Sequence, residues 1–160
     1  MARARSSLNR FADGLLKILR EDAQQNPEDW FTVPRTFRRG VGPEVLSLAD
    51  PVVCVSLNGS VEPLPGPMGY QTSRVALEIA VLMKNGEADE AVGEMWADIG
   101  RVLMSNRQLT GVDDPNNPTI LSGFMSLGTS ELAARDGSSE GEATLVQQVT
   151  IQHAWAATAP

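Results

Sequence analysis

The most regular hydrophobic pattern lies in the middle of the chain and predicts a strand followed by a helix. Residues 72–84, TSRVALEIAVLMK, alternate between apolar and mixed positions, which is the period of a β-strand. After the turn dipeptide at Asn85, residues 87–105 carry an apolar stripe at helical spacing, with Trp96 at its border. The stripe consists of Ala88, Ala91, Val92, Met95, Ile99, Val102 and Leu103.

The N-terminal part of the chain predicts one helix and two strands. Residues 6–22 place Leu8, Phe11, Leu15, Ile18 and Leu19 on one helical face, with Ser6 or Ser7 as the N-cap. Residues 30–37, WFTVPRTF, are aromatic and β-branched, but a proline within them cannot donate to a strand ladder. A strand here is therefore short or at an edge. Residues 51–57, PVVCVSL, predict a strand that is buried on at least one face.

The C-terminal part predicts a hairpin of two strands, ILSGFMSLGTSELAA and ATLVQQVTIQHAWAA. In the second strand one parity is apolar and the other is polar, so one face meets the core and the other meets water or a partner. The apolar parity is Leu145, Val149, Ile151 and Trp155, and the polar parity is Thr144, Gln148, Thr150 and Gln152.

Three segments rich in proline, glycine or polar residues predict projecting loops: 59–70, 107–119 and 135–142. Together with the predicted elements they indicate an α/β (α+β) fold in a single domain over residues 1–160. We expect a mixed, mainly antiparallel sheet of four to five strands flanked by two main helices. The length of 160 residues fits one domain with a real core.

Charge is unevenly distributed along the chain. Residues 1–40 hold eight Lys/Arg against five acids, and the rest of the chain holds five against fifteen, so net charges of +3 and −10 sum to the stated −7. The acidic body argues against wrapping nucleic acid, which needs clustered basic residues. A basic end on an acidic body favours head-to-tail docking of copies, although solvated charges without a partner explain the pattern equally well. The candidate interface residues are Arg3, Arg5, Arg10, Arg38, Arg39, Glu87, Glu90 and Glu94.

Residues that could perform chemistry are few and scattered, so we expect no enzymatic activity, no cofactor and no metal. The single histidine, His153, shares the parity of the apolar face and has no triad partner near it in sequence. The single cysteine, Cys54, lies in an apolar strand pattern typical of a buried thiol. The acidic stretch at Asp113 lacks the ligand spacing of a calcium loop. On the helix of residues 87–105, the acids form a solvated face, with Asp98 spaced to meet Arg101.

The N-terminus begins with arginines but lacks the apolar core and cleavage site of a secretory signal. No apolar run approaches the roughly 20 residues that span a bilayer. We therefore expect synthesis in the cytoplasm and no membrane association.

The chain resembles the tail terminator (tail completion) proteins of long-tailed bacteriophages in the order of its elements. Three stretches carry the resemblance: LNRFADGLLKILRED, SRVALEIAVLMKNGEADEAVGEMWADIGRVL and EATLVQQVTIQHAWAA. The resemblance covers nearly the whole chain as a pattern of elements and contains no diagnostic motif. The proline-rich segment 59–70 and the stretch VDDPNNPT depart from the pattern and leave the loop contacts unassigned.

This resemblance implies a virion protein of the phage tail that is assembled in the cytoplasm of the bacterial host. Such a protein forms a homo-oligomeric ring, commonly a hexamer, that caps the head-proximal end of the tail tube and ends its polymerisation. Its partners are copies of itself, the tail tube protein and the head-tail connector or neck proteins, and DNA passes through the ring without specific binding. The alternatives are another head-tail connector or tube protein, or a small ligand-binding bacterial α/β domain.

Overall fold

The computed structural model describes residues 3–40, 51–64, 70–84, 88–136 and 141–156. Within these ranges the elements in chain order are α1 (Ser7–Gln25), the 3-10 helix η1 (Pro27–Asp29), β1 (Thr36–Arg39), β2 (Val52–Leu64), β3 (Tyr70–Lys84), α2 (Ala88–Ser105), β4 (Gln108–Thr110), β5 (Ser122–Asp136) and β6 (Gly141–Ala156). The predicted class is confirmed: a single α+β domain with a mixed, mainly antiparallel sheet and two main helices. The sheet has six strands, however, where four to five were expected.

Helix α1 follows the predicted pattern closely. Ser6 is its N-cap, because the Ser6 hydroxyl accepts a hydrogen bond from the backbone N–H of Asn9 at 3.3 Å. Phe11, Leu15 and Leu19 are completely buried on one side of the helix. The helix ends at Gln25, with Asn26 as its C-cap, and Pro27 then opens η1, since a proline ring cannot continue an α-helix.

The strand order across the sheet is β1-β2-β3-β6-β5-β4. β1 runs parallel to β2, and the other neighbouring pairs run antiparallel. The prediction for residues 30–37 is confirmed in kind, because β1 is a four-residue edge strand, although it begins only after Pro34. β4 forms the opposite edge and is the strand that was not predicted, since three residues are too few to show a period of two.

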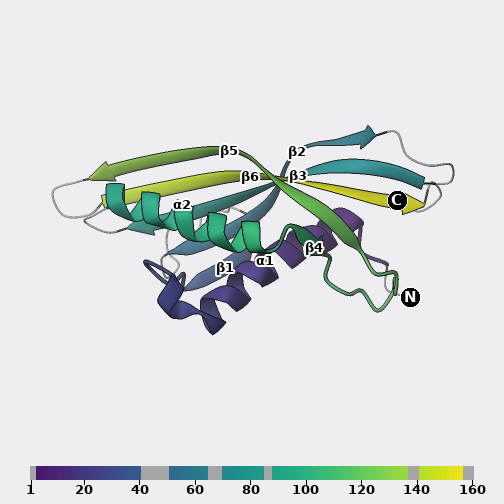
Figure 1. The fold of residues 1–160 in the computed structure, drawn as a ribbon, viewed down its shortest axis with the longest axis horizontal. Helices are drawn as coiled ribbons and strands as arrows, with labels where there is room; N and C mark the ends of the chain where they lie inside the picture. The colour runs from purple at the N-terminus through teal and green to yellow at the C-terminus, as the bar shows by residue number, and fades with distance from the viewer. Residues whose placement is uncertain (1–2, 41–50, 65–69, 85–87, 137–140, 157–160) are drawn as a thin grey trace.

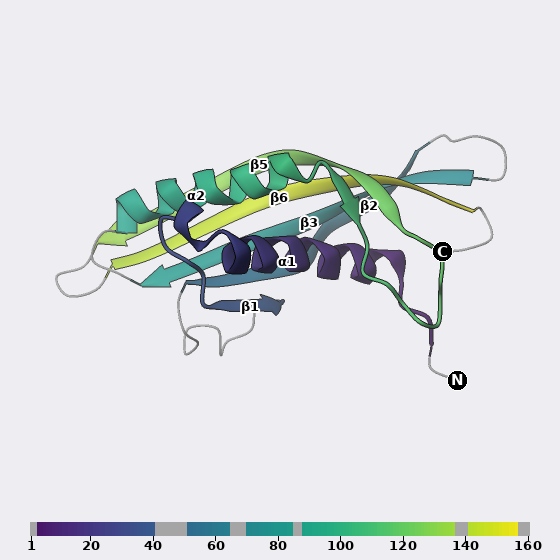
Figure 2. The ribbon, with the colours of Figure 1, turned by 60° about the horizontal axis from the view of Figure 1, so that its bottom comes forward.

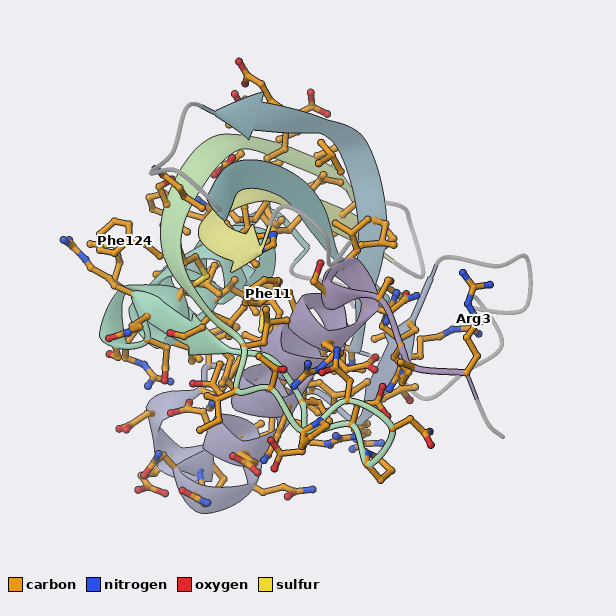
Figure 3. All side chains as sticks on the ribbon, turned by 90° about the vertical axis from the view of Figure 1, so that its right-hand side faces the viewer. Arg3, Phe11 and Phe124 are labelled. Atoms are coloured by element: carbon orange, nitrogen blue, oxygen red, sulfur yellow. The ribbon has the colours of Figure 1, made fainter. Side chains whose placement is uncertain are left out.

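Both helices lie on the same face of the sheet, with α1 beside β1 and β2 and α2 beside β5 and β6 (Figures 1 and 2). The hydrophobic core fills the space between these two helices and the sheet. Seen along the long axis, the sheet curls and Phe11 points from α1 into the enclosed space (Figure 3). All predicted stripe residues of α2 whose side chains are described are buried, as are the predicted core positions Leu145, Val149 and Ile151 of β6. The side chain of Trp155 lies outside the described part.

The predicted loop 59–70 is wrong for most of its length. β2 continues to Leu64 and β3 begins at Tyr70, with Leu64 paired to Thr72, so the connection shrinks to residues 65–69 outside the described ranges. A strand can include Pro63 here because β2 beyond Val55 has a neighbour on one side only, and a missing N–H on the open side costs no ladder bond. The ladder is irregular between Leu57 and Val61.

The predicted hairpin of β5 and β6 is confirmed, but the loop 135–142 is shorter than expected. β5 runs to Asp136, which pairs with Gly141 of β6, and residues 137–140 lie outside the described ranges. Along the hairpin the register shifts once, between Leu127 and Ser130.

The segment 107–119, predicted as a projecting loop, has no named helix or strand from residue 111 to 119, but it is bonded to the start of α1 rather than projecting freely. Its first residues form β4, and the Arg10 guanidinium donates from Nε to the carbonyl oxygen of Val112 and from Nη2 to that of Thr119, both at 2.8 Å. Asp114 accepts from the backbone N–H of Arg5 at 2.6 Å. These long-range hydrogen bonds satisfy backbone carbonyls and a carboxylate that, in a projecting loop, would bond to water.

Candidate interaction surface

The basic residues near the N-terminus are mostly tied to the body of the same chain. The Arg10 side chain is only 2% exposed, and its guanidinium donates hydrogen bonds to the carbonyl oxygens of Val112 and Thr119. Arg10 therefore does not lie on the surface of the single chain. Arg5 forms an ion pair with Asp13, and Arg39 donates from Nη1 to the same carboxylate at 2.7 Å. Arg38 of β1 is half-buried. Arg3 is exposed and points away from the body (Figure 3).

The acidic side chains of α2 are more exposed to solvent than most of the candidate arginines of residues 1–40. Glu90 and Glu94 are exposed, as predicted for a solvated face, while Glu87 lies outside the described residues. Asp98 does not pair with Arg101 as the spacing suggested. Instead it accepts a hydrogen bond from the backbone N–H of Phe31 at 2.9 Å, and its burial raises the pKa of the carboxyl group.

Arg101 pairs with Asp22 of α1, with Nη2 2.9 Å from Oδ2. Asp22 also accepts hydrogen bonds from the indole of Trp30 at 2.8 Å and the amide of Asn26 at 3.1 Å. Burial acts to raise the pKa of Asp22, but the hydrogen bonds from Arg101, Trp30 and Asn26 outweigh it and hold the pKa below its usual value. This cluster joins the last turn of α1 to the C-terminal part of α2, so it stabilises the fold.

Among the candidate interface residues, exposed Arg3 and the exposed acids Glu90 and Glu94 lie far apart on the molecule. The N-terminus lies at one end of the long axis, whereas α2 begins at the other end (Figure 1). Arg3 is close to the first of these ends, and Glu90 and Glu94 belong to the first two turns of α2. The two groups can therefore meet only between different copies of the chain.

An exposed apolar strip, which was not predicted, follows the boundary between α2 and β5. A hollow of about 240 Å³ is lined there by residues 103 and 104 of α2, by residue 107 and by residues 124–127 of β5. Phe124 is 59% exposed and points away from the body (Figure 3). Trp96, placed at the border of the helix stripe by its spacing, is 47% exposed and donates its indole N–H to the hydroxyl of Ser130 at 2.9 Å.

Among the described residues, no group of three or more His, Cys, Asp or Glu side chains is arranged to hold a metal ion. His153 is buried with its ring 4.9 Å from that of Phe11, centroid to centroid. Cys54 is fully buried, and burial raises the pKa of its thiol, which keeps it in the unreactive protonated form. Neither described helix has the length and apolar character needed to cross a membrane.

Comparison with known proteins adds no assignment to this geometry. No protein-family model matches the chain, and no curated protein matches it either.

Proposed function

We propose that this chain is a structural virion protein of the tail terminator type. In this role, copies of the chain form a ring, a hexamer by analogy with the family it resembles, on the head-proximal end of a tail tube. The ring ends tube polymerisation and offers a surface to the connector or neck proteins. Support comes from the order of elements, in which an N-terminal helix, a long strand and helix, and a final hairpin follow one another.

The observation that carries the proposal is the separation of exposed Arg3 from exposed Glu90 and Glu94 along the molecule. The N-terminus and the start of α2 lie at opposite ends of the long axis (Figure 1), and Arg3 follows the N-terminus whereas Glu90 and Glu94 belong to the first two turns of α2. A contact that joins such patches uses two different surfaces of one subunit, and a repeated contact of this kind closes into a ring when its rotation allows. The net charge of −7 also suits a channel that DNA must traverse without adhering, since like charges repel.

The test is the mass of the purified protein by light scattering across protein and salt concentration, alone and with tail tubes, followed by imaging of the large species. We expect a closed ring, or a smaller species that becomes a ring at tube ends, and we expect salt to weaken it because the contact is electrostatic. Open-ended polymers would instead identify a tube subunit. A protein indifferent to tubes would refute the proposal and favour a ligand-binding domain.

A matched pair of variants separates a specific contact from net charge. Glu94→Lys reverses an exposed charge on α2, and Glu28→Lys makes the same change on η1, where the side chain is also exposed. The proposal requires Glu94→Lys to weaken the ring and Glu28→Lys to leave it intact. Equal effects of the two variants would show that only overall charge matters.

A further inference from the structure

One edge of the sheet is open along most of β5. On its outer side β5 is paired with β4 only from Ser122 to Phe124, and the next backbone N–H, that of Met125, donates to the carbonyl of Arg107 at 2.6 Å. Beyond Met125 no other described segment pairs with this side of the strand. An open strand edge carries backbone donors and acceptors that can pair with another strand.

The outer half of this edge is regular. After the shift between Leu127 and Ser130, β5 keeps an unbroken register with β6 from Ser130 to Asp136. The open edge of β2 differs, since it includes Pro63 and an irregular ladder, both of which hinder the addition of a strand. Residues 130–136 are therefore the edge best suited to pair with a further strand.

The same edge exposes apolar surface on the helix side of the sheet. Leu132 lies opposite Leu145 in the register, which places it on the core face, yet 45% of it is exposed. Trp96 of α2 reaches this edge through its bond to Ser130. A strand added to β5 would cover this apolar surface, which is otherwise in contact with water.

The sequence of this edge, SELAARD at residues 130–136, is complementary to itself when it is read in the antiparallel direction about Ala133. In that register Glu131 lies opposite Arg135 of a second copy, and Leu132 lies opposite Ala134. Residues directly opposite each other share a face, so the Glu131–Arg135 pairs fall on one face and the Leu132–Ala134 pairs on the other, where Ser130 and Asp136 form the end pairs. Both pairs occur twice, because the arrangement has a two-fold axis.

The pairing with β6 extends this complementarity across the sheet. Arg135 lies opposite Glu142 in the register of one chain, so the row through the contact would read Glu142, Arg135 and then Glu131 of the second copy. Neighbouring charges alternate in sign along this row, which is the favourable arrangement for cross-strand pairs. The row on the other face would begin with Leu145 and Leu132 and continue with alanines of the second copy.

We propose that residues 130–136 of β5 pair antiparallel with the same residues of a second copy, which joins two sheets into one continuous sheet and makes the free protein a dimer. The two α2 helices then lie on the same face, beside the dyad. This inference does not rest on the proposed ring, because a two-fold contact closes after two copies and cannot extend a ring. A ring that needs the β5 edge would require the dimer to dissociate first.

The test is the dimer dissociation constant from sedimentation equilibrium for four proteins: wild type, Glu131→Arg, Arg135→Glu and the double variant. Each single variant sets like charges opposite each other at both symmetric positions, so we expect the dissociation constant to rise about tenfold. The double variant exchanges both charges and should restore it to within about twofold of wild type. Glu28→Arg, an exposed change away from the edge, should have no effect.

Circular dichroism and thermal unfolding establish that each variant is folded, and the rescue in the double variant keeps the test decisive if a single variant is unstable. A wild-type protein that stays monomeric at all concentrations would overturn the proposal. So would single variants that dimerise as tightly as wild type, or a double variant as weak as the singles, since only two-fold self-pairing predicts the rescue. A ring that forms without β5 pairing would overturn this inference and support the proposed function. A charge-dependent dimer that never forms rings on tubes would support this inference and refute the proposed function.

Discussion

Gly14 is a helix residue whose replacement should destabilise the protein, against the usual rule. In the interior of an exposed helix, alanine is about 1 kcal/mol more favourable than glycine, because glycine loses more backbone freedom on folding. Gly14, however, faces the backbone of β4. A β-carbon at this position would overlap the carbonyl oxygen of Thr110 and would lie 3.5 Å from the α-carbon of Gly111.

The steric cost decides the sign of the effect. The atom that a new methyl group would meet belongs to the backbone, so it cannot rotate away as the end of a long side chain can. Overpacking of this kind costs about 1–3 kcal/mol, which exceeds the helix-propensity gain over most of that range. For Gly14→Ala we therefore expect a net loss of up to about 2 kcal/mol. The melting temperature should fall by several degrees, since about 1 kcal/mol corresponds to roughly 2–4 °C in a chain of this size.

The chain supplies a matched control on the other helix. Gly93 and Gly100 lie in α2, and a β-carbon at either position would meet nothing within 4 Å. Gly93→Ala should therefore raise the melting temperature by roughly 2–4 °C through propensity alone. Urea unfolding and thermal unfolding measure both variants. If Gly14→Ala stabilises the protein as much as Gly93→Ala does, α1 does not lie against β4 as described.

Two further changes test the polar contacts between the helices and the segment around β4. Asp22→Asn should cost about 1–2 kcal/mol near neutral pH, because it removes the charged acceptor of Arg101. The folded-state pKa of Asp22 is lowered, so its contribution is present above the unfolded-state pKa and is lost as the pH falls through the folded-state value. The difference between variant and wild type should therefore shrink below a pH of about 4, and a constant difference across pH would contradict the ion pair. Arg10→Met should lower the free energy of unfolding by about 2–4 kcal/mol, because the carbonyls of Val112 and Thr119 lose a charged donor. Residues 112–119 should then become sensitive to protease. Unchanged protease resistance would show that other contacts hold this segment.

The sequence by itself determined the elements with long periodic patterns. A serine cap at Ser6 or Ser7, the apolar stripes of both helices, the long strand before α2 and the alternation of β6 follow from local spacing, because a helix or strand shows its buried face through its own period. The burial of Cys54 was also predicted, since it lies in an apolar strand pattern. His153 shares the apolar side of its strand, but the sequence left open whether it is a structural or a surface residue. These predictions needed no knowledge of which elements are neighbours.

Only the tertiary structure decided the features that depend on neighbours distant in sequence. Arg10 looks like a surface charge in the sequence, but it is buried because the carbonyls of Val112 and Thr119 come to meet it. Pro63 suggests a loop, but it lies in a strand because its outer side has no ladder to break. The open edge of β5 follows from the strand order, and the crowding at Gly14 follows from its contact with β4. Local patterns record what each residue prefers, and only the packed chain determines which neighbour it meets.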